Sequence, residues 1–139
     1  MYKKILLAID GSENSLRAAA EAAKLAKADA DAVVEIVYVT VPPKTAREIL
    51  LEPSKEEQEK VRNAKIQPVE KILDDAAVQH KTSIITGEAA PAIVQHSKTM
   101  GADIIVIGSR GLNAVQKFVL GGVSNDVVQK ATVPVLLVK

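Results

Sequence analysis

Two apolar runs, each followed by a glycine-containing turn, constrain the fold of this chain more than any other feature. The first run lies within residues 2–9 and the second within residues 103–107. Continuous aliphatic runs of this length are typical of strands buried on both faces of a parallel sheet. A helical pattern follows each turn, so the sequence predicts consecutive strand, turn and helix units.

The other predicted elements continue this alternation. Further strands are expected at residues 33–39, 83–86 and 135–138. Helices are expected from Ser12 to about Asp29, from Ser54 toward His80, around Ile93 and Val94, and from Asn125 to Lys130. This order predicts an α/β fold, namely a single doubly wound domain over residues 1–139 with a five-stranded parallel sheet and helices on both faces.

Apolar spacing predicts how the first helix packs. Small and aliphatic residues recur at three- and four-residue intervals, which indicates a face directed at the sheet. The residues of this face are Leu16, Ala19, Ala20, Ala23 and Ala26. Because most of them are alanine, we expect the helix to approach the sheet closely.

Prolines, a serine and a glycine indicate where the predicted elements begin and end in the middle of the chain. Two prolines end the second strand, and residues 41–53 are expected to form a loop with some helical turns. Ser54 fits a capping box at the start of the next helix. Pro68 lies inside that helix, so we expect a kink or a break near Gln67. Gly101 is suited to end the following helix.

The composition narrows the possible functions. The 139 residues carry a formal net charge of +1 and 2% aromatic residues, which disfavours nucleic-acid binding through phosphates or through stacked bases. The absence of cysteine excludes disulfides, thiolate metal sites and thiol catalysis. His80 and His96 are expected on helices, in surface or packing roles. With no membrane-length apolar segment and no signal-peptide pattern, we expect a cytoplasmic protein that does not bind membranes.

A glycine pattern predicts a two-part phosphate-binding loop. Gly-x-x-Gly at residues 108–111 follows the second apolar run, and after nine residues Gly-Gly-Val-Ser occupies residues 121–124. Such glycines let backbone N–H groups converge on an anion. Ser124 is expected to cap the last helix, whose N-terminus would add donors. The pattern is neither a Walker A loop nor Gly-x-Gly-x-x-Gly, and the alternative is that these glycines only shape turns.

The first turn predicts a second part of the same site. Asp10 ends the first apolar run, and Ser12 is a natural N-cap. Open α/β sheets bind ligands outside the carboxyl ends of strands where the strand order reverses, so Asp10 and residues 108–111 would face one crevice if their strands are neighbours. The alternative for Asp10 is a turn-capping role. Arg110 either reaches a phosphate or points to solvent.

From end to end, the sequence resembles the universal stress protein family. The resemblance rests on residues 9–12, 108–111 and 121–124 and on the closing run 133–138. It implies the strand order 3-2-1-4-5, homodimers, and ATP in the crevice with adenine contacted at the end of the second strand. One position departs from the pattern, because members with the full motif usually carry Ser or Thr where this chain has Gly122.

The predicted nucleotide site combines strand ends with both glycine segments. Aliphatic side chains at strand ends would sandwich the adenine ring, and backbone groups near Thr40 and Val41 would bond its edge. Asp10 would lie near the ribose or the phosphates and hold Mg²⁺ through water. The full set is Ala8, Ile9, Asp10, Gly11, Ser12, Val39, Thr40, Val41, Gly108, Ser109, Arg110, Gly111, Gly121, Gly122, Val123 and Ser124.

These residues favour a binding module that holds ATP, ADP or AMP and signals by its bound state. Neither glycine segment offers a Glu, Gln or His with an evident place to orient water, so we expect no catalytic residue and at most slow hydrolysis. The alternatives are a slow ATPase or phosphotransferase, and a structural dimer without nucleotide. The dimer is expected to pair through the last strand, Val135, Leu136, Leu137 and Val138.

Overall fold

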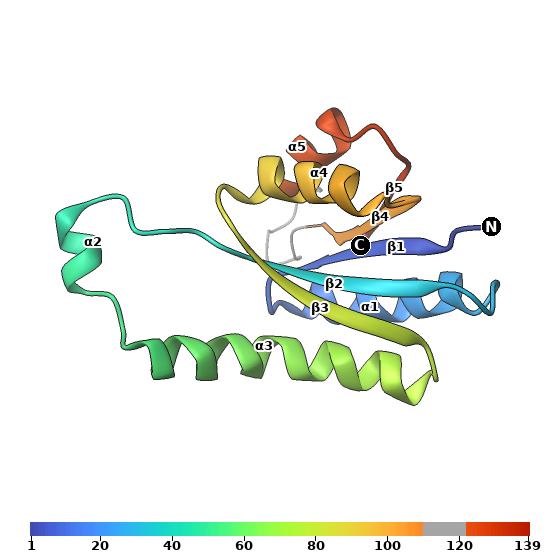
Figure 1. The fold of residues 1–139 in the computed structure, drawn as a ribbon, viewed down its shortest axis with the longest axis horizontal. Coiled ribbons are helices and arrows are strands. Elements are labelled where there is room, and N and C mark those ends of the chain that lie inside the picture. Colours follow the sequence, from blue (N-terminus) through green and yellow to red (C-terminus); the bar gives the residue numbers. More distant parts are fainter. Residues whose placement is uncertain (110–121) are drawn as a thin grey trace.

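The computed structural model describes residues 1–109 and 122–139. Five strands form one parallel sheet in the order β3-β2-β1-β4-β5, which confirms the predicted doubly wound topology (Figure 1). The strands are β1 (Lys4–Ile9), β2 (Val33–Thr40), β3 (Gln79–Thr86), β4 (Ile104–Gly108) and β5 (Val135–Val138). The helices are α1 (Glu13–Ala26), α2 (Ala46–Leu50), α3 (Lys55–Asp75), α4 (Ala89–Met100) and α5 (Gly122–Lys130).

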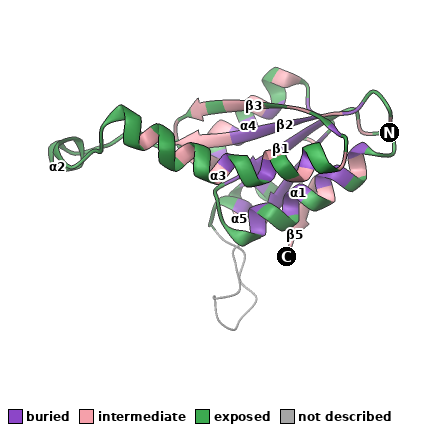
Figure 2. Ribbon diagram, turned by 90° about the horizontal axis from the view of Figure 1, so that it is seen from below, coloured by how far each residue is buried: buried purple, intermediate pink, exposed green. Residues whose placement is uncertain are grey.

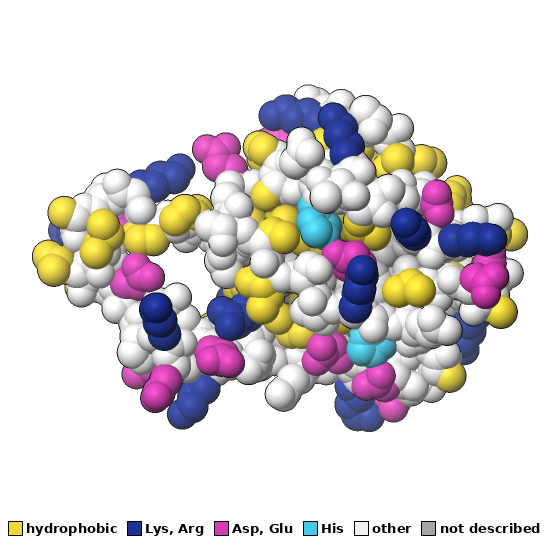
Figure 3. All heavy atoms as spheres, in the orientation of Figure 1, with side chains coloured by type: hydrophobic (Ala, Val, Ile, Leu, Met, Phe, Trp, Pro, Cys, Tyr) yellow, Lys and Arg dark blue, Asp and Glu magenta, His cyan; other side chains and the backbone are white. Residues whose placement is uncertain are grey.

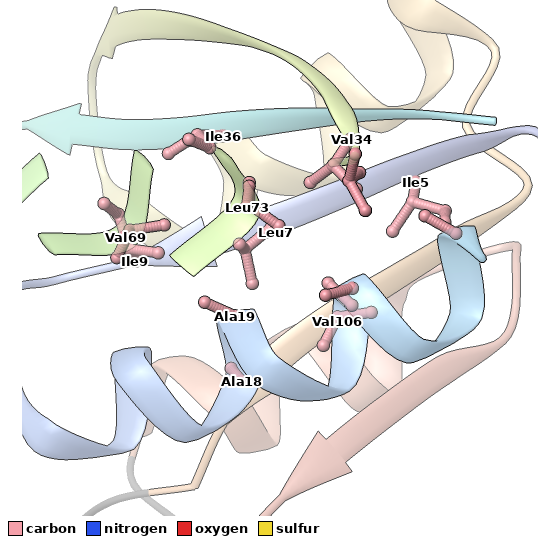
Figure 4. Close-up of a cluster of buried hydrophobic side chains, with 14 of the residues drawn as sticks. Ile5, Leu7, Ile9, Ala18, Ala19, Val34, Ile36, Val69, Leu73 and Val106 are labelled. Atoms are coloured by element: carbon pink, nitrogen blue, oxygen red, sulfur yellow. The ribbon is translucent and has the colours of Figure 1, made fainter. Parts of the chain in front are cut away.

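Helices cover both faces of the sheet, with α1 and α3 on one side and α4 and α5 on the other (Figure 1). Alternate side chains of β1 feed two separate cores. Ile5, Leu7 and Ile9 pack toward α1 and α3 (Figure 4), whereas Leu6 and Ala8 pack toward α4 and α5. This two-sided burial explains why the strand is apolar at consecutive positions. The buried residues accordingly concentrate in the central strands and on the inner sides of the helices (Figure 2).

The first helix packs through alanines, but its buried face is rotated from the predicted one. Ala19, Ala23 and Ala26 are buried as expected, together with Ala18 and Ala22. The prediction was wrong for Leu16, which is 37% exposed, and for Ala20, which faces solvent. The reason is that Asn14 and Ser15 are buried against the sheet at the start of the helix, and this turns the stripe toward residues 18 and 22.

Between β2 and β3 the structure departs from the sequence prediction in three ways. The helix α3 runs unbroken through Pro68, so the predicted break near Gln67 was wrong. It ends at Asp75, and β3 begins at Gln79, four residues earlier than expected. His80 therefore lies on a strand rather than a helix, where it pairs in register with Val34. An edge strand keeps one side in water, and this explains its polar first half.

Three predicted helix signals are confirmed, and a fourth is wrong. Ser12 caps α1 and accepts a hydrogen bond from the N–H of Ser15, and Ser54 caps α3 and accepts one from the N–H of Glu57. Gly101 ends α4 in the left-handed conformation. Ser124 does not cap α5, because that helix already begins at Gly122.

In the loop between β2 and α3, the short helix α2 has no buried residue, and its apolar side chains are visible at the surface (Figure 3). In the described part of the chain, no helix is long and apolar enough to cross a membrane.

A buried carboxylate links α4 to the sheet. Glu35 in β2 is 4% exposed, and its Oε2 lies 2.5 Å from His96 Nε2 in α4 and accepts a 2.8 Å hydrogen bond from Ser83 Oγ in β3. Lys81 Nζ lies 3.4 Å from the other carboxylate oxygen. Burial alone would raise the pKa of Glu35, but the hydrogen bonds from His96 and Ser83 and the positive charge beside it hold the pKa below its usual value. His96 is thus on a helix and serves packing, as predicted.

Candidate functional site

A cleft of about 290 Å³ opens at the carboxyl ends of β1, β2 and β4. β1 is flanked by β2 on one side and β4 on the other, so the cleft lies where the strand order reverses. Its lining residues come from these strand ends, the β1–α1 turn and helices on both faces: Ala8, Ile9, Asp10, Ser12, Ser15, Tyr38, Val39, Lys65, Ala89, Ile93, Ile107, Gly108, Val123 and Ser124. The volume is near the lower end for small-molecule sites.

Half of the predicted site residues line this cleft. They are Ala8, Ile9, Asp10, Ser12, Val39, Gly108, Val123 and Ser124. Gly11 lines an adjacent cavity of about 280 Å³ between α1 and α3, whereas Thr40, Val41, Ser109 and Gly122 line neither. Arg110, Gly111 and Gly121 lie outside the described residues, and their predicted roles stay predictions.

The turn after β1 is fixed by a closed set of hydrogen bonds. Asp10 Oδ1 accepts bonds of 2.9 Å from the N–H of Ser12 and from Ser15 Oγ. Ser15 Oγ in turn accepts from the N–H of Asp10 at 2.9 Å. Burial alone would raise the pKa of Asp10, but the bonds from Ser12 and Ser15 outweigh burial and lower it, so the carboxylate is ionised at neutral pH. Asp10 therefore shapes the turn and also presents a negative charge to the cleft.

The end of β4 is held against two neighbouring elements. Ser124 Oγ donates a 2.8 Å hydrogen bond to the carbonyl of Gly108, which ties α5 to the strand. The N–H of Ser109 donates to the carbonyl of Val138 at 2.7 Å. This N–H, which the sequence assigned to phosphate, is thus already used to extend the β4–β5 pairing. A Cβ on Gly108 would lie 2.8 Å from Asn14 Cβ, so glycine is needed there for the close approach of α1.

At the end of β2, the polar groups bond to β3 and its following turn. The carbonyl of Thr40 accepts a 3.0 Å bond from the N–H of Gly87. The hydroxyl of Thr40 bonds the carbonyl of Ile85 and lies 3.2 Å from the hydroxyl of Thr86. Val41 is 57% exposed. Of the predicted adenine contacts at this strand end, it is therefore Val39 that the structure brings into the cleft.

Sequence reasoning missed six lining residues: Ser15, Tyr38, Lys65, Ala89, Ile93 and Ile107. The strand register signals one of them, because Ile107 pairs with Ala8, which was itself a predicted site residue. Ser15 could also have been predicted, because a hydroxyl three residues after an N-cap lies in the first helical turn. Lys65 gives no local signal, because only the packing of α3 against α1 brings it to the cleft.

The lining divides into an apolar wall and a polar rim. Ala8, Ile93 and Ile107 belong to the core beneath α4 and α5. The polar groups come from the β1–α1 turn, β2, α1, α3 and α5, and among the described lining residues they include one carboxylate, Asp10, and one ammonium, Lys65. Across residues 1–109 and 122–139, no cluster of three His, Asp or Glu side chains is arranged to hold a metal ion. The arrangement suits a small ligand with an apolar ring and polar substituents.

Comparison with known proteins places the chain in one family. The model of the universal stress protein family matches residues 1–139. Universal stress protein YxiE of Bacillus subtilis is 37% identical over 153 residues, and a universal stress protein of Thermus aquaticus is 38% identical over 144 residues; each alignment covers 100% of both chains. A solved universal stress protein in complex with cAMP is similar with a TM-score of 0.76 at 25% identity, covering 99% of this chain and 97% of that one. This chain therefore belongs to the universal stress protein family.

Proposed function

We propose that this protein binds an adenine nucleotide, ATP, ADP or AMP, in the cleft at the carboxyl ends of β1, β2 and β4, and that it acts as a dimeric binding module. The observation that carries the proposal is the composition of the cleft, which joins an aliphatic wall to a rim with Asp10, Ser12 and Ser15. The complex of a related universal stress protein with cAMP supports the same ligand class.

The two parts of the lining suit the two parts of a nucleoside. The aliphatic side chains of Ala8, Val39 and Ile93 offer a surface for the adenine ring. The carboxylate of Asp10 is an acceptor for ribose hydroxyl groups, and the structure gives it no hydrogen bond at Oδ2 from any described residue. A single ionised carboxylate also fits Mg²⁺ held through water, since that ion commonly uses one carboxylate together with phosphate oxygens.

A binding role is favoured over catalysis by what the cleft presents. Phosphoryl transfer to water needs a side chain that orients the nucleophile. Among the described lining residues there is no Glu, Gln or His, and Asp10 Oδ1 is engaged by Ser12 and Ser15. We therefore propose slow or no turnover. We also propose that the protein acts in the cytoplasm.

The proposed dimer pairs through β5. This strand is at one edge of the sheet, and all four of its residues are only partly buried. An edge strand with unsatisfied backbone groups and apolar side chains favours pairing with its own copy across a two-fold axis. Leu136 faces the core beneath α1, and Leu137 faces the core beneath α4 and α5, so pairing would extend both.

The experiment that tests the binding proposal begins with the purified protein. It is denatured and assayed for released nucleotide, and the refolded protein is titrated calorimetrically with ATP, ADP and AMP. Ala89→Leu places a larger side chain at the cleft and should abolish binding, whereas Ala20→Leu on the exposed face of α1 should leave it unchanged. Equal binding by both variants, or no binding by the wild type, would overturn the proposal. Production of ADP from ATP during the titration would favour the ATPase alternative.

A further inference from the structure

Lys65 reaches the cleft from a helix that is remote in sequence from the other lining residues. Its side chain lines the nucleotide cleft and also the adjacent cavity between α1 and α3. The aliphatic part of the side chain crosses the β1–α1 turn directly over Gly11, where a Cβ would lie 2.6 Å from Lys65 Cγ. Gly11 has a φ of +90°, which favours glycine independently. The turn is thus shaped so that the stem of Lys65 fits against it.

Among the described residues, the ammonium group of Lys65 has only uncharged partners. Its Nζ lies 3.4 Å from the hydroxyl of Tyr38 and 5.8 Å from the centroid of the Tyr38 ring. No carboxylate of the described residues lies within 4.0 Å of it, in contrast to Lys71, whose Nζ is 2.9 Å from Asp75. Lys65 is also partly buried, with its aliphatic stem packed over Gly11. An ammonium at a cleft with no described carboxylate within 4.0 Å favours an anion beside it, because a hydrogen bond between opposite charges is stronger than one to a neutral group.

We infer that Lys65 is a ligand-binding residue, which donates to a phosphate oxygen of the bound nucleotide and leaves its contact with Tyr38 to do so. The inference rests on the proposed nucleotide binding and adds the group that recognises the phosphate. A hydrogen bond between an ammonium and a phosphate oxygen is stronger than one to a phenol, and the flexible stem of lysine permits the movement. Asp10 and Lys65 then contact different parts of the ligand, because the carboxylate accepts hydrogen bonds from hydroxyl groups and repels phosphate.

The inference predicts selective loss of affinity. Lys65→Met keeps the aliphatic stem over Gly11 and removes the charge. We expect it to weaken binding of ATP and ADP about tenfold, the lower end of what a hydrogen bond to a charged group supplies. Adenosine, which has no phosphate, should bind both proteins equally. Lys65→Arg should retain most of the nucleotide affinity, because it keeps a cationic donor.

The experiment compares four proteins and three probes by calorimetry. The proteins are the wild type, Lys65→Met, Lys65→Arg and the control Lys60→Met, which changes an exposed lysine of the same helix that lines neither cavity. The probes are ATP, adenosine and inorganic tripolyphosphate. A loss of ATP affinity in Lys65→Met alone, with adenosine unchanged, supports the inference. Equal losses for ATP and adenosine would mean that Lys65 only packs the turn, and would overturn it.

The same probes separate this inference from the nucleotide proposal. If the wild type binds neither ATP nor adenosine, nucleotide binding fails, and tripolyphosphate alone decides the role of Lys65. Binding of tripolyphosphate that is lost in Lys65→Met and kept in Lys60→Met would then support an anion site at Lys65 for a free polyphosphate. Tripolyphosphate binding that is absent, or is equal in these two variants, would overturn the inference.

Discussion

Gly108→Ala tests whether the close approach of α1 to the end of β4 stabilises the fold. The new Cβ would lie 2.8 Å from Asn14 Cβ, 2.9 Å from the Asn14 carbonyl oxygen and 3.0 Å from its carbon, while ordinary contact begins at 3.4 Å. Two of these atoms belong to the backbone, so α1 must shift as a unit. Forcing an extra methyl group into packed structure costs about 1–3 kcal/mol, and the lower chain entropy of alanine in the unfolded state returns about 0.4–1 kcal/mol.

The expected net loss in the free energy of unfolding is therefore about 1–2 kcal/mol, or roughly 3–7 °C in Tm for a domain of this size. Urea and thermal unfolding followed by circular dichroism measure it. Gly122→Ala is the matched control, because an added Cβ there meets no described atom within 4 Å and the residue lies in α5. That variant should be unchanged or up to about 1 kcal/mol more stable. If Gly108→Ala is as stable as the wild type, the contact with Asn14 does not constrain the fold.

Three further predictions concern the dimer, the ligand and a buried charge. Leu136→Lys should give a monomer by light scattering with an unchanged circular dichroism spectrum, and a folded dimer would place the interface elsewhere. Gly122→Ser has room for its hydroxyl and should raise the calorimetric affinity for ATP more than for ADP; equal gains would show that the hydroxyl does not reach the γ-phosphate. Glu35→Gln should cost about 1–3 kcal/mol at pH 7, because His96 and Lys81 lose a charged partner. The pKa of Glu35 is lower in the folded state than the unfolded value of 4.5. Its contribution to the free energy of unfolding is therefore present above pH 4.5 and is lost as the pH falls through the folded pKa. Urea unfolding should accordingly show a smaller difference in the free energy of unfolding between the wild type and Glu35→Gln at pH 3 than at pH 7.

The parts of the fold that the sequence predicts are those whose cause is local. β1 and β4 are buried on both faces, so their apolar runs are uninterrupted and unambiguous. Ser12 and Gly101 mark helix ends through their own backbone geometry. Only the second half of β3 was predicted, because the strand lies at the sheet edge and its first residues need not be apolar. The same difference between local and tertiary causes explains the unbroken passage of α3 through Pro68, since packing of the helix can outweigh one lost backbone bond.

For the site, the sequence predicts the strand ends and the first turn, but it does not predict what α3 contributes. Asp10 and Gly108 directly follow or end apolar strands, and parallel strands bring their carboxyl ends to one edge. Lys65 and Tyr38 come together because α3 packs against α1 on the same face of the sheet, a contact that no spacing in the sequence encodes. The cleft therefore has a predictable strand-end wall and an unpredicted cationic side, and the cationic side bears most directly on the proposed recognition of phosphate.

The glycines of the motif also show why a pattern of identical residues need not have a single cause. Gly11 is required by a φ of +90° and by the stem of Lys65, and Gly108 by the backbone of α1 at Asn14. Both positions would restrict substitution even in a protein that bound no ligand. Gly122 differs, because no described atom lies within 4 Å of an added Cβ and its φ is not positive. A side chain can therefore be added at position 122 without disturbing the described fold, and for that reason substitutions at this position test the proposed recognition of the phosphate separately from the stability of the sheet.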